Sequence, residues 1–122
     1  MTKRNQPEAR LHRTIVQVVK LSAFPDVLWL HVPNAGIRSG IEAGYLKSLG
    51  LLPGAADLLF WRGGKSYAME VKAAGGRLSD TQKAFRDRFI EAGGEWASVD
   101  NIEAAICQLR TWDLIKTLRQ AA

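Results

Sequence analysis

DLLFWRGGKSYAMEVK, residues 57–72, is the stretch of sequence that decides the fold, because its pattern predicts a β-hairpin. Gly63 and Gly64 lie at its centre, and both central positions of a type I′ turn need a positive φ, which glycine adopts without steric cost. Apolar and aromatic residues flank the glycines on both sides. Folding about this turn pairs Arg62 with Lys65, and every further pair follows from that one.

The predicted register brings acidic and basic side chains together at the open end of the hairpin. Counting outward from the turn, Asp57 lies opposite Glu70. Lys72 points to the same face as Glu70, because side chains alternate along a strand. Two carboxylates and one amine should therefore converge on one side of the sheet.

Two opposed carboxylates repel each other, since their Cβ atoms lie only ~5 Å apart in an antiparallel pair. Mg²⁺ or Mn²⁺ would remove this repulsion, because hard cations prefer carboxylate oxygens and keep several waters. Such an ion can polarise a phosphoryl oxygen and acidify a water, while the Lys72 amine orients that water or stabilises developing charge. The alternative is an ordinary strand end, where Asp57 and Glu70 are polar surface residues and Lys72 forms a salt bridge.

The chain has 122 residues, of which 47% are hydrophobic and 24% are charged. These values are typical of a soluble globular protein, and we expect one domain over residues 1–122. No apolar run approaches the ~20 residues that span a bilayer, and the polar N-terminus lacks the apolar segment of a secretory signal. We therefore expect a cytoplasmic protein without a membrane partner, whose single cysteine, Cys107, is a reduced, small core residue.

The net charge of +5 and an isoelectric point near 9.7 favour a polyanionic partner such as a nucleic acid. Because the lysines and arginines are dispersed along the chain, an ordinary solvated surface also accounts for many of them.

Helical spacing of apolar residues predicts a first helix over residues 6–23, capped by Asn5. Glu8 has an ordinary role there, as the acid of a capping box. It also lies on the apolar stripe, three residues before Leu11 and four before His12, so it is a candidate third acidic ligand.

The remaining elements alternate between strand and helix. Strands are predicted over residues 27–32 and 95–99, a short helix over residues 41–49, a helix capped by Ser79, and a last helix that begins at Asp100. A hairpin combined with a strand that follows a helix implies a mixed sheet. We therefore expect an α/β fold in which a mixed central sheet of about four strands is flanked by helices.

Several polar and aromatic residues have both an ordinary and a functional interpretation. His12 and His31 lie in apolar patterns, where a histidine is more often a satisfied structural residue than a proton carrier. The tryptophans are core or interface residues by similar reasoning. Asn34 and Arg38 could contact phosphate or a partner subunit, or serve only as turn and surface residues. Small residues before Arg77 would let a phosphate backbone approach, or simply make a turn.

Five segments, taken in order, resemble the VRR-NUC branch of the PD-(D/E)XK nuclease superfamily over nearly the whole chain. They are Glu8, PNAGIR at residues 33–38, GAAD at residues 54–57, Glu70-Val71-Lys72, and GRLSDTQ at residues 76–82. The resemblance implies a restriction-endonuclease-like fold. One departure is Ala56, which stands where the family usually has a proline directly before the aspartate, so a backbone constraint is lost but no carboxylate.

The resemblance also implies a set of site residues, namely catalytic Asp57, Glu70, Lys72 and Gln82, and metal ligands Glu8, Asp57, Glu70 and Val71, the last through its carbonyl. Gln82 would support the site from the helix after the hairpin, although a capping-box glutamine is its ordinary interpretation. Asn34, Arg38 and Arg77 are the candidate nucleic-acid contacts.

We therefore expect a Mg²⁺- or Mn²⁺-dependent DNA endonuclease that uses water as the nucleophile. Stand-alone VRR-NUC domains of this size resemble structure-selective endonucleases of phage and bacteria. That likeness implies branched DNA such as four-way junctions, DNA repair, a homodimer, and a bacterial or phage-infected host cell. The alternatives are a non-catalytic DNA-binding module or a nuclease subunit of a larger complex, and an α/β protein whose carboxylates are accidental.

Overall fold

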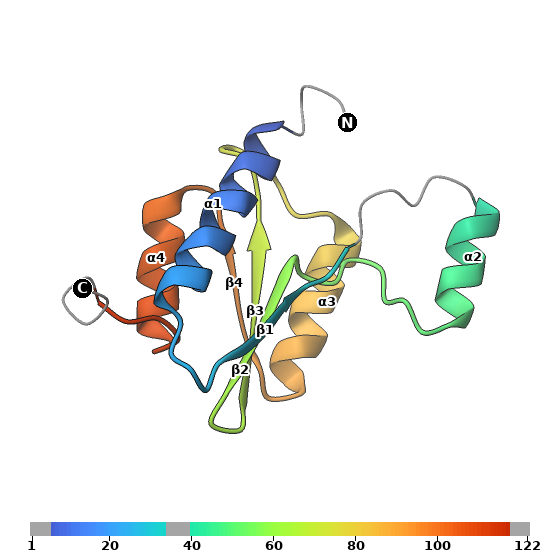
Figure 1. Cartoon of the computed structure of the whole chain (residues 1–122). Helices are drawn as coiled ribbons and strands as arrows, with labels where there is room; N and C mark the ends of the chain where they lie inside the picture. The colour runs from blue at the N-terminus through green and yellow to red at the C-terminus, as the bar shows by residue number, and fades with distance from the viewer. Residues whose placement is uncertain (1–5, 34–39, 118–122) are drawn as a thin grey trace.

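The computed structural model describes residues 6–33 and 40–117 (Figure 1). Its elements are, in order, α1 (Gln6–Ser22), β1 (Leu28–His31), α2 (Gly40–Ser48), β2 (Leu58–Arg62), β3 (Lys65–Val71), α3 (Asp80–Glu91), β4 (Glu95–Val99) and α4 (Ile102–Thr111). This is the predicted order, with ends close to those expected. None of these helices is long and apolar enough to cross a membrane.

The strands form one mixed sheet in the order β1-β2-β3-β4. β1 pairs with β2 and β2 with β3 in antiparallel orientation, whereas β3 and β4 run parallel. α3 makes the crossover between the two parallel strands, because a tight turn cannot join strands that run in the same direction. The expected mixed α/β fold is confirmed.

The β2–β3 hairpin has the register that its two glycines predict. Both turn glycines have a positive φ, 59° and 80°. Arg62 pairs with Lys65, and the ladder ends at Leu58 opposite Met69. The next position beyond this end of the ladder holds Asp57, so the predicted register carries through to the candidate site.

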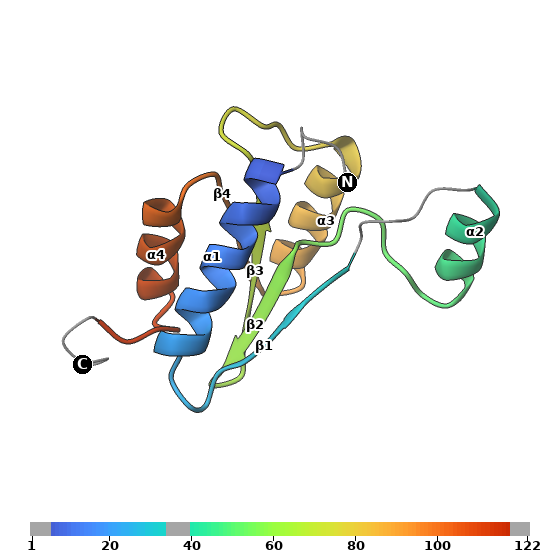
Figure 2. The same ribbon diagram turned by 45° about the horizontal axis from the view of Figure 1, so that its top comes forward.

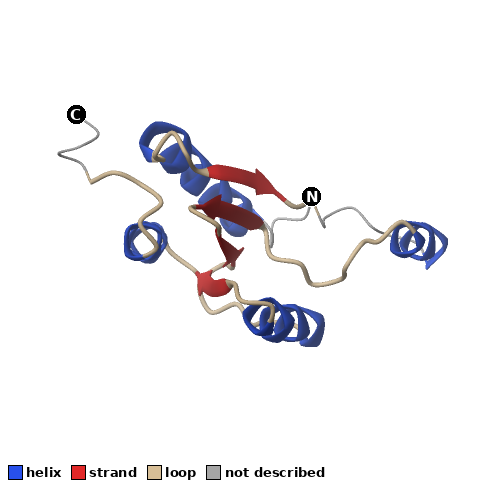
Figure 3. Ribbon diagram, turned by 90° about the horizontal axis from the view of Figure 1, so that it is seen from below, coloured by secondary structure: helices blue, strands red, loops and turns tan. Residues whose placement is uncertain are grey.

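Helices cover both faces of the sheet. α1 and α4 lie on one face and α3 on the other, as Figures 1 and 3 show. The end of α1 is joined to the segment after α4, because the Lys116 N–H donates to the Ser22 carbonyl at 2.8 Å. α2 differs from the other helices, since it lies apart from the sheet and none of its residues is buried (Figure 2).

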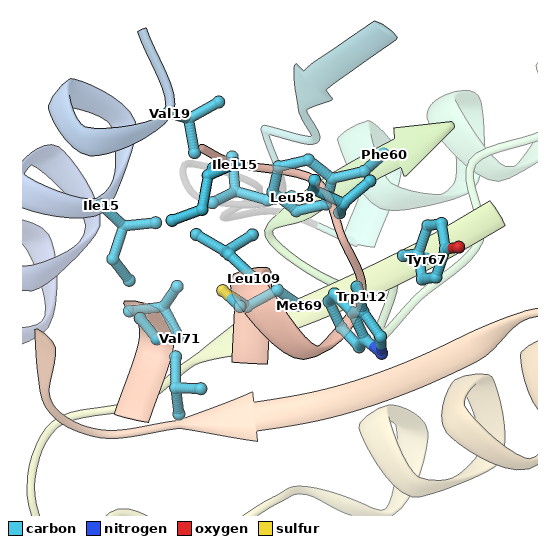
Figure 4. Packing of buried hydrophobic residues seen from close by; sticks show 13 residues of the cluster. Ile15, Val19, Leu58, Phe60, Tyr67, Met69, Val71, Leu109, Trp112 and Ile115 are labelled. Carbon is cyan, nitrogen blue, oxygen red and sulfur yellow. The ribbon is translucent and has the colours of Figure 1, made fainter. Parts of the chain in front are cut away.

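The main hydrophobic core lies between the sheet and the two helices, α1 and α4, that cover one of its faces (Figure 4). Alternate strand residues enter this core, Leu58 and Phe60 from β2 and Met69 and Val71 from β3, and Ile15 of α1 packs with them. Burying each such side chain contributes roughly 1.5–3 kcal/mol. The intervening strand residues face α3, where Ala56, Ala68 and Phe85 form a smaller cluster.

α3 and α4 each begin with a side-chain cap. The predicted capping box of α3 is present, because Ser79 Oγ accepts from the Gln82 N–H at 3.2 Å and Gln82 Oε1 accepts from the Ser79 N–H at 2.9 Å. Two backbone donors of the first turn are thereby satisfied. The cap of α4 is Asn101 and not the expected Asp100, and Asn101 Oδ1 accepts from the Ala104 N–H at 2.8 Å.

The expectation that Cys107 is a core residue is wrong, because its side chain is exposed. Ala105 and Leu109 form the buried face of α4. Cys107 lies two residues from each of them, which places it on the opposite side of a helix with about 3.6 residues per turn.

Gly54 allows the segment before β2 to touch the backbone of α3. It has a φ of 80°, and a Cβ atom at this position would lie 2.2 Å from the Thr81 carbonyl oxygen and 2.7 Å from the Gln82 nitrogen. Only glycine meets both conditions without strain. The contact holds the loop that leads to Asp57 against the first turn of α3.

We predict that Gly54→Ala lowers the free energy of unfolding by roughly 2 kcal/mol or more, because the new methyl group meets backbone atoms at a strained φ. Urea denaturation followed by circular dichroism measures this change. Gly44→Ala is the matched control, since no atom of the described residues lies within 4 Å of a Cβ added to Gly44 in α2. A Gly54→Ala protein as stable as the Gly44→Ala protein would contradict the contact.

Candidate active site

The predicted site residues come together where β3 ends and β2 begins. Asp57 immediately precedes β2, Glu70 is the last residue but one of β3, and Lys72 follows that strand. Gln82 lies in the first turn of α3 and Glu8 in the first turn of α1. Two helices and a hairpin therefore each bring polar side chains to the same end of the sheet.

Asp57 is held by the strands on both of its sides. Its Oδ2 accepts a hydrogen bond from the Val71 N–H of β3 at 2.7 Å. Its carbonyl oxygen accepts from the Val32 N–H, which follows β1, at 2.8 Å. Because Leu58 and Met69 face the main core, alternation turns Asp57 and Glu70 toward the other face together.

Glu70 is a charged residue in an interior position, with only 2% of its surface exposed. Its Oε2 lies 3.5 Å from Gln82 Nε2, which donates a long hydrogen bond to it. Its Oε1 has no hydrogen-bond partner among the residues that the structure describes. A buried carboxylate oxygen without a partner costs free energy, so this position favours a proton or a cation.

Burial raises the pKa of Glu70 from 4.5 to about 9. The Asp57 carboxyl is the second cause, because it can accept a hydrogen bond from protonated Glu70 and repels the charged form. The positive charge of Lys72 acts in the opposite direction, and the charge of Glu8 adds to the repulsion. Without a cation, Glu70 therefore holds a proton at neutral pH.

Gln82 combines its capping role with a contact to the site. Its Oε1 accepts the Ser79 N–H, which leaves the Nε2 group directed at Glu70. A glutamate at this position could make the same cap but would place another carboxylate against Glu70. The amide therefore suits both neighbours, and one side chain both caps α3 and contacts Glu70.

Glu8 lies near the strand-end residues as well. Burial raises its pKa, Lys72 opposes that rise, Asp57 adds to it, and a hydrogen bond from the Ala73 backbone opposes it.

Within residues 6–33 and 40–117, the Lys72 ammonium makes no ion pair. It can therefore contact a phosphate or a water without first leaving a carboxylate.

The acidic residues fit a divalent cation that has few protein ligands. Among the described residues, no three His, Cys, Asp or Glu side chains are grouped closely enough to hold a metal ion by themselves. Mg²⁺ nevertheless keeps several waters and is commonly held by one or two carboxylates together with substrate phosphates. Asp57 and Glu70, whose Oε1 has no partner within the described residues, provide that number of carboxylates.

The other candidate residues fall into three groups. Val71 is fully buried at the end of β3, and its N–H binds Asp57. Arg77 is exposed on the loop after Lys72. Asn34 and Arg38 lie outside the described residues, so their proposed contacts with nucleic acid stay predictions.

The histidines lie closer to the site than sequence patterns indicate. His31 Nδ1 is 2.9 Å from the Asp57 carbonyl oxygen, and the His12 ring meets the His31 ring edge to face with centroids 4.6 Å apart. His31 is a satisfied strand histidine, as predicted, but the group that satisfies it belongs to Asp57. No local pattern reveals this partner, because it lies 26 residues further along the chain.

A mixed sheet covered by helices, with two acids and a lysine at its strand ends, defines a restriction-endonuclease-like domain. The family model of the VRR-NUC domain matches residues 5–110. Because this match covers most of the chain, the protein belongs to the VRR-NUC family and carries a nuclease domain. No match was found among curated proteins.

We predict that the metal-free protein loses stability as the pH rises from about 7.5 to about 8.5. The pKa of Glu70 is about 9 in the folded state and near 4.5 in the unfolded state, so the folded state binds more protons between these values. The contribution of Glu70 to the free energy of unfolding is fully present below about pH 4.5. It falls by on the order of 1 kcal/mol per pH unit as the pH rises toward 9. Urea denaturation in the presence of a chelator measures the slope.

Glu70→Gln is the control for this pH dependence, because the amide has a similar shape and does not titrate. Its stability should change less with pH than that of the wild type over the same interval. His12 contributes little to the change of stability in this pH interval, because burial lowers its pKa from 6.5 and so away from the interval. Equal slopes for the two proteins would show that Glu70 is not protonated in the folded state.

Proposed function

We propose that this protein is a Mg²⁺- or Mn²⁺-dependent endonuclease that hydrolyses DNA phosphodiester bonds. The observation that carries the proposal is Glu70, a buried carboxyl beside Asp57 whose Oε1 has no hydrogen-bond partner in the described part of the chain. A cation between these acids would offset their repulsion and satisfy that oxygen. Membership of a nuclease family makes a phosphodiester the expected substrate.

Each residue has a role that its position supports. Asp57 and Glu70 would hold the cation, with Glu8 and the Val71 carbonyl as further or water-mediated contacts. When bound, the cation would polarise a phosphoryl oxygen and make the attacking water more acidic. Lys72 would orient that water or stabilise negative charge on the phosphate. Gln82 would keep Glu70 in position through its Nε2 group and the capping box.

A net charge of +5 supports a polyanionic substrate, and exposed Arg77 lies on the loop that leaves the site. We propose branched DNA, such as a four-way junction, because stand-alone domains of this family and size resemble structure-selective endonucleases. Two symmetric cuts in a branched substrate require two active sites, which a homodimer supplies.

A non-catalytic DNA-binding module is the second candidate. It is favoured by one observation, that no group of three metal-ligating side chains is preformed among the described residues. Such a module would bind DNA through its basic surface and would show no metal-dependent cleavage.

We predict that Lys72→Ala and Glu70→Gln each lower the cleavage rate by roughly 100-fold or more, since each removes a group from the reacting centre. Labelled junction, flap, duplex and single-stranded DNA, each incubated with Mg²⁺, Mn²⁺ or a chelator, provide the measurement. Lys65→Ala is the matched control, because this exposed lysine lies in the same hairpin beside the turn, at the far end from the site.

The outcomes separate the two candidate functions. Cleavage that needs metal, is lost in the site variants and is kept in Lys65→Ala supports the nuclease. Binding of DNA by all proteins with no metal-dependent cutting supports the module. Cleavage within about threefold of wild type in Lys72→Ala, less than ~0.7 kcal/mol of barrier, would remove that lysine from the catalytic set.

The surface of α2 supports the homodimer. Ile41 and Tyr45, four residues apart on one side of the helix, are 88% and 63% exposed, and Leu49 just after the helix continues this apolar face. An isolated helix of this length is marginal in water. A second copy of the chain that covers this face would bury the apolar residues and stabilise the helix.

We predict that the wild type is a dimer at micromolar concentration and that Ile41→Glu combined with Tyr45→Glu makes it a monomer, because charges would be buried in the contact. Sedimentation velocity measures the two masses. Ile90→Glu, a change to an exposed apolar residue of α3, should leave the dimer intact. A monomeric wild type, or a dimeric double variant, would exclude α2 as the subunit contact.

A further inference from the structure

The position of Asp57 depends on groups outside its own strand. It lies one residue before β2, after a loop that contains Pro53 and Gly54, so it is not fixed by the regular ladder between β2 and β3. Its carbonyl oxygen accepts from two donors on the β1 side, the Val32 N–H at 2.8 Å and His31 Nδ1 at 2.9 Å. Both lone pairs of this oxygen are thereby used.

The contact with His31 defines the state of its ring. A carbonyl oxygen can only accept, so Nδ1 of His31 must carry the hydrogen. The edge-to-face contact with His12 then orients the His31 ring from α1. β1 and α1 therefore act together on the backbone of Asp57, while the carboxylate of Asp57 faces the other side of the sheet.

The effect on the site follows from the backbone of Asp57. Its carbonyl is anchored toward β1 while its Oδ2 is anchored by the Val71 N–H of β3 at 2.7 Å. If the carbonyl anchor is loosened, the short aspartate side chain moves with the backbone. Asp57 would then no longer keep its place beside Glu70.

We propose that His31 is a positioning residue, which through its Nδ1–H bond to the Asp57 carbonyl holds the Asp57 carboxylate in place for cation binding. This role rests on the proposed function, because it acts through the candidate cation site. His31 does not touch the cation or the substrate in this role.

Two substitutions separate the hydrogen bond from the ring. His31→Phe keeps an aromatic ring against His12 but removes the donor. His31→Asn places an amide nitrogen as many bonds from the backbone as Nδ1, so it can keep the donor while losing the ring. Leu28→Ala, on the same strand and 64% exposed, controls for changes to β1 that do not reach Asp57.

The first measurement uses metal-free protein. Hydrogen exchange of the Val71 amide, observed by NMR, reports the bond to Asp57 Oδ2. We expect faster exchange of this amide in His31→Phe, and wild-type exchange in His31→Asn and Leu28→Ala, with circular dichroism confirming that each protein is folded. Equal exchange in His31→Phe and wild type, or exchange in His31→Asn as fast as in His31→Phe, would overturn the proposal.

The second measurement uses Mn²⁺ calorimetry and steady-state cleavage. We expect His31→Phe to weaken Mn²⁺ binding and lower kcat by roughly tenfold with little change in KM for DNA, and His31→Asn to restore both to within about threefold. An Asn variant as impaired as the Phe variant would assign the effect to ring packing and reject the positioning role. If the wild type neither binds Mn²⁺ nor cleaves DNA, the proposed function fails, and the Val71 amide alone decides whether His31 positions Asp57.

Discussion

The pairing of β2 with β3 is the interaction on which both the core and the site depend. Because side chains alternate, a slip of one residue would send Asp57 to the face opposite Glu70 and would move Leu58 out of the main core. The tight turn at Gly63 and Gly64 and the burial of alternate residues therefore both disfavour this one-residue shift of register. A register that is stabilised by the core therefore also places the two acids side by side, although burying Glu70 there costs free energy.

Glu70 shows how the site opposes the stability of the fold. Within residues 6–33 and 40–117 one of its carboxylate oxygens has no hydrogen-bond partner, and its neighbours raise its pKa, so the charged form is unfavourable until a cation is present. A well-packed core residue would be easier to bury in a small domain. An acid at this position agrees with the proposed cation site, since perturbed and incompletely satisfied groups concentrate at functional sites.

The sequence predicts those parts of the molecule that depend on neighbours along the chain. The glycine turn gives the hairpin register, and the spacing of Ser79 and Gln82 gives the capping box. The contact of Gly54 with α3 and the bond from His31 to Asp57 could not be predicted, because they join segments that only the folded sheet brings together. The exposure of Cys107 could not be predicted either, because an apolar pattern alone does not reveal which side of α4 meets the sheet.

Ala56 shows how tertiary contacts can replace a local backbone constraint. A proline before Asp57 would restrict the chain by itself, whereas alanine leaves the unfolded chain more freedom. In the folded protein Ala56 is fully buried with Ala68 and Phe85, and the next residue is held by donors on both sides. The rigidity of Asp57 therefore comes from β1, β3 and α3 together. It follows that the position of Asp57 is coupled to β1, β3 and α3, and is not set by the loop before β2 alone.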